Sequence, residues 1–359
     1  MEVFCAAWGI EVRTEMMFES ISTPHRPNWA LRIACAAGVF ALGAGLVSVW
    51  RMTQMPLRSH TGALPPLSAA QAELAGRLSE DVRQLSSTIR ERNLRHEGSL
   101  KATADYLRRD LTQAGYTVAE QTYPIQGDAV SNIEADLVGS VIADGVLIVG
   151  AHYDSADGTV GANDNATGVA ATLELARWLR GSHLRRTVRF VFFVNEEPPY
   201  FQTGQMGSLV YAQRLKRESV PVSAMISLET IGYYSDKPGS QKYPPLLNLL
   251  YPSRGDFIGF VGNSESRDLV QRVTRAFRES ARFPSEGIAA PADWPGIGWS
   301  DHWSFWQEGW PAIMVTDTAP FRYPYYHNAF DTADKVDFER MARVVDGLRS
   351  VVVLLANAR

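Results

Sequence analysis

Beyond Gly115 the sequence alternates short runs rich in β-branched and aromatic residues with longer stretches of helical apolar spacing. A strand, a helix and another strand in repeated succession require right-handed crossovers and bury the strands in a mainly parallel sheet. We therefore predict an α/β fold for this part of the chain. The predicted elements are strands at 146–150, 188–194, 222–228 and 312–316, and helices at 166–180, 205–216, 266–280 and 338–356.

An apolar segment near the amino terminus, residues 33–50, contains no charged side chain and lies between Arg32 and Arg51. Its length is just sufficient to cross a bilayer. A buried core helix and a signal peptide have similar composition, but the run is longer than the ~7–15 residues of a usual signal core. We therefore expect an uncleaved transmembrane anchor after a cytoplasmic segment at 1–32. An anchor in this position usually exports the rest of the chain, so we expect the catalytic domain on the periplasmic or extracellular side.

The chain beyond the anchor is predicted to be one large domain. Proline, serine, glycine and threonine between 56 and 66 indicate a linker, placed at 51–67, and the catalytic domain is placed at 68–359, beginning with two helices before Gly115. The two cysteines, Cys5 and Cys35, precede this domain, so a metal there requires His, Asp or Glu ligands. Scattered Lys and Arg and a net charge of −4 exclude the basic stripe that nucleic acid requires. The oligomeric state stays open.

Histidines and carboxylates follow the predicted strands at the points where the strands end. In parallel sheets, ligands bind beyond these carboxyl ends. Histidine and carboxylate without thiolate suit zinc, and several carboxylates suit a pair of cations. The residues in question are His152 and Asp154, Glu196 and Glu197, Glu229, and, in a later loop, His327.

Each of these residues also has an ordinary structural explanation. A lone histidine can cap a strand, Asp164 can cap the helix that follows it, and single polar residues at strand ends are often solvated. Two features favour a metal site instead. A carboxylate two residues after His152 can fix the imidazole tautomer. The neighbouring carboxylates of Glu196 and Glu197 repel one another unless a cation lies nearby. The HExxH helix of the zincins is absent from the sequence.

Four ordered segments resemble the successive blocks of the di-zinc aminopeptidase family of zinc exopeptidases, whose relatives include bacterial aminopeptidases, glutamate carboxypeptidases and glutaminyl cyclases. The resemblance covers roughly residues 70–359. It implies a three-layer sandwich with helices on both faces of a mixed, mainly parallel central sheet. The segments are AHYDSADGTVGANDNATGVAATLELAR, RFVFFVNEEPPYFQTGQMGS, SLETIGYY and SDHWSFWQEGWPAIMVTDTAPFRYPYYHNAFDT.

The resemblance also implies a ligand set for two zinc ions. His152, Asp164 and Glu229 would hold one ion, and Asp164, Glu197 and His327 the other, with Asp164 shared. The peptide bond after Asp164 is expected to be cis, as in relatives. Relatives usually have Asp at the position of Glu229, so the geometry of the first site is less defined than that of the second.

Catalytic roles are implied by the same resemblance. Glu196 is expected to be the general base that activates a water bridging the metals, and Asp154 to orient His152. Asp301 and His302 either support the site or stabilise their own loop. Tyr325 or Tyr326 can donate a hydrogen bond to an oxyanion.

We expect a zinc-dependent exopeptidase, an aminopeptidase that hydrolyses N-terminal residues from peptide substrates. A one-zinc acyltransferase of the glutaminyl cyclase type is the nearest alternative, and a catalytically silent ectodomain is another. Five aromatic residues either form a pocket for apolar substrate side chains or belong to the core. They are Trp294, Trp299, Trp303, Phe305 and Trp306.

Overall fold

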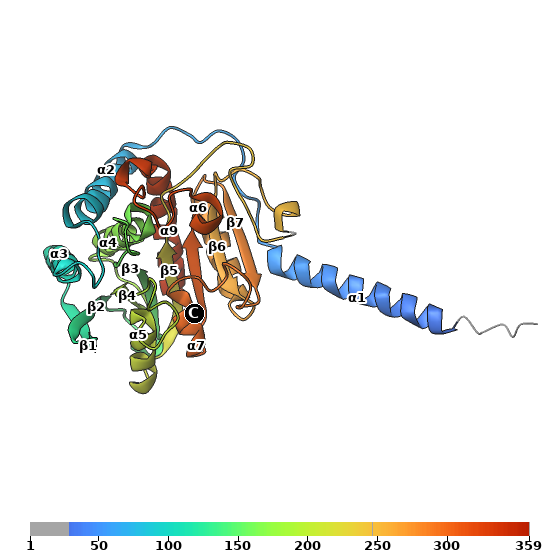
Figure 1. Ribbon diagram of the computed structural model, residues 1–359, viewed down its shortest axis with the longest axis horizontal. Coiled ribbons are helices and arrows are strands. Elements are labelled where there is room, and N and C mark those ends of the chain that lie inside the picture. The colour runs from blue at the N-terminus through green and yellow to red at the C-terminus, as the bar shows by residue number, and fades with distance from the viewer. Residues whose placement is uncertain (1–28, 246, 359) are drawn as a thin grey trace, which may run out of the picture. The chain divides into compact units, whose positions relative to one another are not determined.

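The computed structural model describes residues 29–245 and 247–358 (Figure 1). The chain divides into one unit that ends at Ser48 and another that begins at Val49. Helix α1 (Trp29–Thr53) contains the predicted apolar segment and is long and apolar enough to cross a membrane. The predicted cytoplasmic segment lies outside the described residues except for 29–32.

An eight-stranded mixed sheet forms the centre of the second unit, in the order β1-β2-β4-β3-β5-β8-β6-β7. Strands β3, β4, β5 and β8 run parallel to one another, whereas β2 and β6 pair antiparallel with their neighbours β4 and β8. The carboxyl ends of the four parallel strands therefore meet at one edge. The strands are β1 (Val118–Ile125), β2 (Asp128–Leu137), β3 (Val146–His152), β4 (Thr187–Phe193), β5 (Val222–Glu229), β6 (Ile258–Asn263), β7 (Ser285–Ala290) and β8 (Ala312–Thr316).

Helices cover both faces of this sheet, which confirms the predicted three-layer sandwich (Figure 1). One face carries α2, α3, α4, α6 and α9, and the other carries α5 and α7. The helices are α2 (Ala69–Arg83), α3 (Ser99–Gln113), α4 (Thr167–Leu179), α5 (Gly207–Arg217), α6 (Arg267–Ser280), α7 (His302–Gln307), α8 (Ala319–Arg322) and α9 (Phe338–Asn357). Short helical turns add η1 (Gln84–Ile89), η2 (Ile142–Asp144), η3 (Ala162–Ala166), η4 (Leu247–Leu249) and η5 (Ala333–Lys335).

The predicted strands and helices of the central region are confirmed to within a few residues at their ends. Strands β1, β2, β6 and β7 were not predicted. Three of them have a visible reason: half of the β1 side chains are exposed, and glycine and alanine dilute the β-branched residues of β6 and β7.

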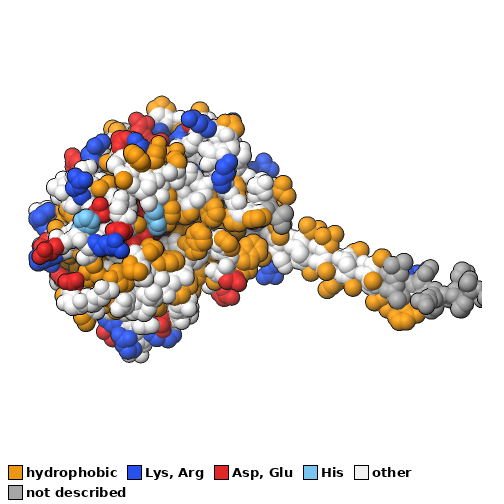
Figure 2. Space-filling view, in the orientation of Figure 1, with side chains coloured by type: hydrophobic (Ala, Val, Ile, Leu, Met, Phe, Trp, Pro, Cys, Tyr) orange, Lys and Arg blue, Asp and Glu red, His pale blue; other side chains and the backbone are white. Residues whose placement is uncertain are grey.

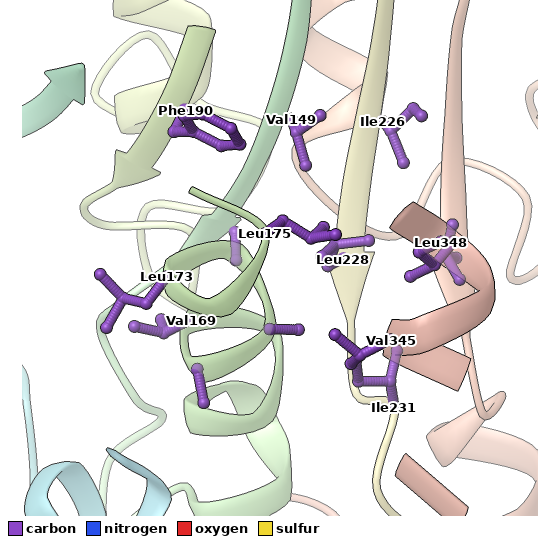
Figure 3. Packing of buried hydrophobic residues seen from close by; sticks show 14 of the residues in the cluster. Val149, Val169, Leu173, Leu175, Phe190, Ile226, Leu228, Ile231, Val345 and Leu348 are labelled. Carbon is purple, nitrogen blue, oxygen red and sulfur yellow. The ribbon is translucent and has the colours of Figure 1, made fainter. Parts of the chain in front are cut away.

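The central strands are buried on both faces because helices pack on each side. Along β3, Leu147 and Val149 belong to the core under α4 and α9, whereas Val146 and Ile148 belong to the core under α5 and α7. Figure 3 shows Val149 and neighbouring strand residues beside the apolar side chains of α4 and α9. Continuous apolar runs are typical of such doubly covered strands. This packing fixes the strand ends that carry the polar residues.

Candidate metal centre

The structure brings all five predicted ligands together at the carboxyl edge of the parallel strands. His152 is the last residue of β3, Glu229 is the last residue of β5, and Glu197 lies just beyond β4. Asp164 belongs to the η3 turn before α4, and His327 lies in the loop after α8. All are buried except His327, whose side chain is about one third exposed.

Two groups of three side chains share Asp164. In one, Nε2 of His152 lies 3.4 Å from Oδ1 of Asp164 and 3.2 Å from Oε2 of Glu229. In the other, Nε2 of His327 lies 3.1 Å from Oδ2 of Asp164 and 3.1 Å from Oε2 of Glu197. Asp164 thus turns a different oxygen toward each group. Ligand atoms at ~2.0–2.1 Å from a tetrahedral zinc are themselves separated by about 3.3 Å, so both groups have the spacing of zinc ligands.

The polar atoms at this centre lack ordinary partners. Among the described residues, Nε2 of His152, Nε2 of His327 and Oδ2 of Asp164 are buried and make no hydrogen bond. An imidazole N–H shared between two carboxylate oxygens bonds weakly to each of them. One cation can instead accept a lone pair from the imidazole nitrogen and from both carboxylate oxygens of a group. The residues present therefore fit a zinc ion in each group.

The electrostatics of the site favour the binding of a cation. Burial raises the pKa of Glu197 and that of Glu229 to about 7, because a carboxylate is costly to hold in a dry environment. Burial lowers the pKa of His152, but the charges of Glu229 and Glu196 outweigh it and hold that pKa well above its usual value. Bound cations stabilise such carboxylates in the ionised form.

Asp154 connects the end of β3 with the residues that follow β4. Its Oδ1 lies 3.5 Å from Nδ1 of His152, the ring nitrogen opposite the one that faces Asp164. Its two oxygens accept hydrogen bonds of 3.1 Å from the backbone N–H groups of Glu196 and Glu197. One buried carboxylate therefore faces the imidazole and holds the backbone of both glutamates.

Glu196 is placed beside the first group of ligands without belonging to it. Its Oε2 lies 3.8 Å from Nε2 of His152, and its side chain is buried. Burial raises the pKa of the Glu196 carboxyl well above its usual value, against the opposing charge of His152. A basic carboxylate at this place can accept and return a proton.

Asp164 is held by residues that the sequence did not single out. The peptide bond between Asp164 and Asn165 is cis, as expected from the resemblance. Asp331 accepts hydrogen bonds from the backbone N–H groups of Asn163 (2.8 Å) and Asp164 (3.0 Å). Asn165 donates to the carbonyl oxygen of Leu228 at 2.8 Å. The only sequence signal for Asp331 is its position four residues after His327.

The segment that contains Asp301 and His302 reaches the centre through the preceding residue, Ser300, whose hydroxyl donates to Oε2 of Glu229 at 2.8 Å. Asp301 is fully buried, and neither of its oxygens has a hydrogen-bond partner within residues 29–245 and 247–358. Burial raises its pKa to about 7. His302 lies 2.7 Å, through Nε2, from the carbonyl oxygen of Ile297, and burial lowers its pKa to about 4. His302 thus supports its own loop.

An apolar pocket of about 800 Å³, including the solvent at its mouth, opens beside Glu229 and Tyr326. Tyr326 stacks on His327 with ring centroids 3.9 Å apart, so a residue that lines the pocket also contacts a candidate ligand. Of the five aromatic residues considered as pocket residues, Trp299 lines it, and Phe305 is instead fully buried in the core. In Figure 2, histidine and carboxylate side chains lie beside a broad group of hydrophobic ones. Other lining residues include Ile288, Ile297, Met314 and Phe321.

The fold is a mixed sheet covered by helices, and histidines and carboxylates lie together at the ends of its parallel strands. This combination is that of a metallohydrolase of the zinc exopeptidase type. The chain belongs to peptidase family M28, whose profile matches residues 132–352. It is therefore a hydrolase that acts on peptides.

The chain is also similar in sequence to several proteins and in fold to several solved structures. The protein YfbL of Escherichia coli K12, which is described as uncharacterized, is 42% identical over 292 residues, covering 79% of this chain and 88% of its own. A probable leucine aminopeptidase of Trichophyton verrucosum is 27% identical over 243 residues, covering 63% of this chain and 58% of its own. The fold matches a zinc aminopeptidase from Bacillus subtilis with a TM-score of 0.63, 16% identity and coverage of 79% and 95%. It also matches the glutaminyl cyclase of Fimbriiglobus ruber with a TM-score of 0.57, 20% identity and coverage of 82% and 98%.

Proposed function

We propose that this protein is a two-zinc aminopeptidase that removes apolar residues from the amino termini of peptides. The observation that carries the proposal is the pair of ligand groups that share Asp164 through different oxygens. His152 and Glu229 complete the first group, and Glu197 and His327 complete the second. Glu229 thus takes the position usually occupied by Asp in relatives.

The reaction needs a nucleophile, a proton acceptor and a polarised carbonyl. When bound, zinc supplies Lewis acidity toward water and toward the scissile carbonyl. Glu196 takes the proton of the attacking water and returns it to the departing amine, which restores the carboxylate. Asp154 faces Nδ1 of His152 and accepts a hydrogen bond from the backbone N–H of Glu196, so the general base keeps its distance from the ligands.

Exopeptidase specificity is supported by the pocket beside the ligands. A substrate whose first side chain fills the pocket lined by Ile288, Met314 and Trp299 places its free amine near the carboxylate of Glu229. An ammonium group is favoured there, because carboxylates attract it electrostatically. Burial of one leucine-sized side chain contributes about 1.5–3 kcal/mol to binding, which favours apolar first residues.

Glutaminyl cyclase chemistry with one zinc is the competing function, since such enzymes share the fold. The second complete ligand group, His327 and Glu197 with Asp164, favours hydrolysis with two ions.

The decisive experiment measures zinc per chain and turnover together. We expect two zinc ions per chain, loss of leucyl-peptide hydrolysis on chelation and recovery on addition of zinc, because the ligands must be filled to create the nucleophile. A peptide with amino-terminal glutamine serves as the second substrate. One zinc per chain with cyclisation of that peptide identifies the competing function, and full hydrolysis by metal-free protein refutes both.

We further propose that α1 anchors the enzyme in a membrane with the catalytic domain outside the cytoplasm. The length and apolar composition of the helix support this. Carbonate extraction of membranes from cells that express the full chain tests the anchor. Protease accessibility in spheroplasts tests the side.

A further inference from the structure

Arg92 is the largest fully buried side chain among the described residues. It lies between η1 and α3, ahead of the region that matches the family, and none of the roles above uses it. Burying a charged group is costly unless it is paired and hydrogen-bonded. Its partners therefore indicate what the burial achieves.

The guanidinium donates to backbone carbonyls at both ends of the segment that joins His152 to Asp164. Nε donates to Tyr153 at 2.8 Å, the residue directly after His152. Nη1 donates to Val160 at 2.6 Å, and Nη2 donates to Gly161 at 2.9 Å, shortly before Asp164. A planar fork with five donors can span such a set of carbonyls, whereas a lysine has three donors on one atom.

The main chain of Arg92 ties down the middle of the same segment. Its N–H donates to Oγ of Ser155 at 3.0 Å, and its carbonyl accepts from the N–H of Ser155 at 2.9 Å. The fit is tight at Gly161, which has a φ of +56° and where a Cβ would lie 2.9 Å from Nη2 of Arg92 and 2.3 Å from the carbonyl oxygen of Asp164. Residues 153–161 and the side chain of Arg92 therefore pack closely, with little room for a larger residue at Gly161.

The charge of Arg92 also matches its surroundings. Burial lowers its pKa to about 10, and the carboxylates of Asp154, Asp331, Asp164 and Glu197 act in the opposite direction. The side chain therefore remains cationic at neutral pH, behind an acidic site.

We propose that Arg92 is a positioning residue for the metal centre, which fixes residues 153–161 so that His152 and Asp164 keep the separation of two ligands. The inference rests on the metal centre proposed above. The segment between η1 and α3, which precedes the region matched by the family, would then take a direct part in building the site. A buried arginine that merely fills space would affect stability without a specific effect on zinc.

The test compares Arg92→Lys and Arg92→Met with matched changes at Arg186. Arg186 donates to the carbonyls of Asp144 (2.9 Å) and Leu355 (2.8 Å) and directly precedes β4, so it lies at the opposite edge of the sheet. Zinc affinity is measured by competition with a chromophoric chelator. Thermal unfolding and amide hydrogen exchange of residues 153–161 are measured on the full-length, zinc-free proteins.

We expect Arg92→Met to weaken zinc binding ~10–100-fold, as is typical for residues that orient ligands, and Arg92→Lys to weaken it less. Both changes should accelerate exchange in residues 153–161 before any zinc is added. The Arg186 variants should lower the unfolding temperature and leave zinc affinity unchanged.

Wild-type zinc affinity in Arg92→Lys would overturn the proposal, and so would equal losses of affinity at Arg92 and Arg186. If Arg92→Met does not fold, Arg92→Lys alone decides. A wild-type protein without zinc would instead refute the proposed function. The exchange measurement needs no metal, so it separates that outcome from a failure of the inference about Arg92.

Discussion

The hydroxyl of Ser300 donates a hydrogen bond of 2.8 Å to Oε2 of Glu229, the same oxygen that lies 3.2 Å from Nε2 of His152. Ser300 is itself fully buried and lies 3.0 Å from Oγ of Ser227 on β5. The resemblance implies Asp at this position in relatives, and this bond restricts the longer arm of Glu229. The carboxylate orientation is therefore fixed by a neighbouring side chain.

Ser300→Ala should weaken zinc binding at the position shared by His152 and Glu229 by about 10-fold, because the carboxylate loses the donor that orients it. Titration with a chromophoric chelator measures this. Ser304→Ala is the matched control, since Ser304 is also buried but pairs with Ser208 at 2.9 Å. Equal zinc affinity in the two variants would show that the bond to Glu229 does not orient a ligand.

Glu229→Ala should reduce the zinc content to about one ion per chain and severely reduce turnover, because the group with Glu197 and His327 stays complete. The zinc content and turnover of Glu229→Asp should lie between those of the wild type and Glu229→Ala, since the shorter side chain does not fully reach a zinc ion in a site shaped for Glu. Elemental analysis of the purified proteins gives the zinc content. Two tightly bound ions and normal turnover in Glu229→Ala would leave Glu229 as a mere strand-end carboxylate, and Asp301 would then be the next ligand to test.

Glu196→Gln should keep both metals and lose at least ~100-fold in kcat, because removal of a general base slows proton transfer without removing a ligand. Glu197→Gln is the matched change one residue on, and it should release zinc from the group with His327. Measurements of zinc content and steady-state kinetics distinguish the loss of a general base from the loss of a ligand in these two variants. Loss of zinc in Glu196→Gln would mean that the two glutamates have exchanged roles.

Trp299→Ala should lower kcat/KM for substrates with a large apolar first residue by about 10-fold, in the range of ~1–3 kcal/mol that a hydrophobic pocket contributes to discrimination. Trp299 lines the pocket and stacks on Phe321 with ring centroids 6.0 Å apart. Alanyl substrates should be affected less, because they reach less of the pocket. Trp178→Ala removes an aromatic side chain of similar exposure on α4 and should leave both substrates unchanged. Equal losses for leucyl and alanyl substrates would contradict the assignment of the pocket.

A chain that begins at Val49 should be soluble and folded, whereas one that begins at Ser68 should unfold at least about 5 °C lower. Residues 55–59 belong to the folded unit: Arg278 donates to the carbonyl oxygens of Pro56 (3.1 Å) and Leu57 (3.0 Å), and Ser59 accepts from the N–H of Ser285 at 2.8 Å. Part of the segment predicted as a linker therefore packs along α6 and β7. Thermal unfolding followed by circular dichroism compares the two chains, and equal midpoints would show that these bonds add no stability.

Three of the five candidate ligands could be found from the sequence because each lies close to the end of a strongly patterned strand. His152 and Glu229 end β3 and β5, and Glu197 follows β4. Parallel strands bring such ends to one edge whatever the details of packing. Strands β6 and β7 could not be predicted, because glycine and alanine have low β propensity. Their burial also depends on neighbours far along the chain.

The alternation of strands and helices, the apolar helix and the residue types at the strand ends could thus be predicted from the sequence, since these depend on local periodicity and short spacings. Three relationships become visible only in the folded chain: Asp164 presents one oxygen to each histidine, Ser300 donates to Glu229, and Arg92 donates to the residue after His152. The bond from Ser300 to Glu229 joins residues 71 positions apart, and the bond from Arg92 to Tyr153 joins residues 61 positions apart. No local pattern specifies them, because their geometry exists only once the helices have packed on both faces of the sheet.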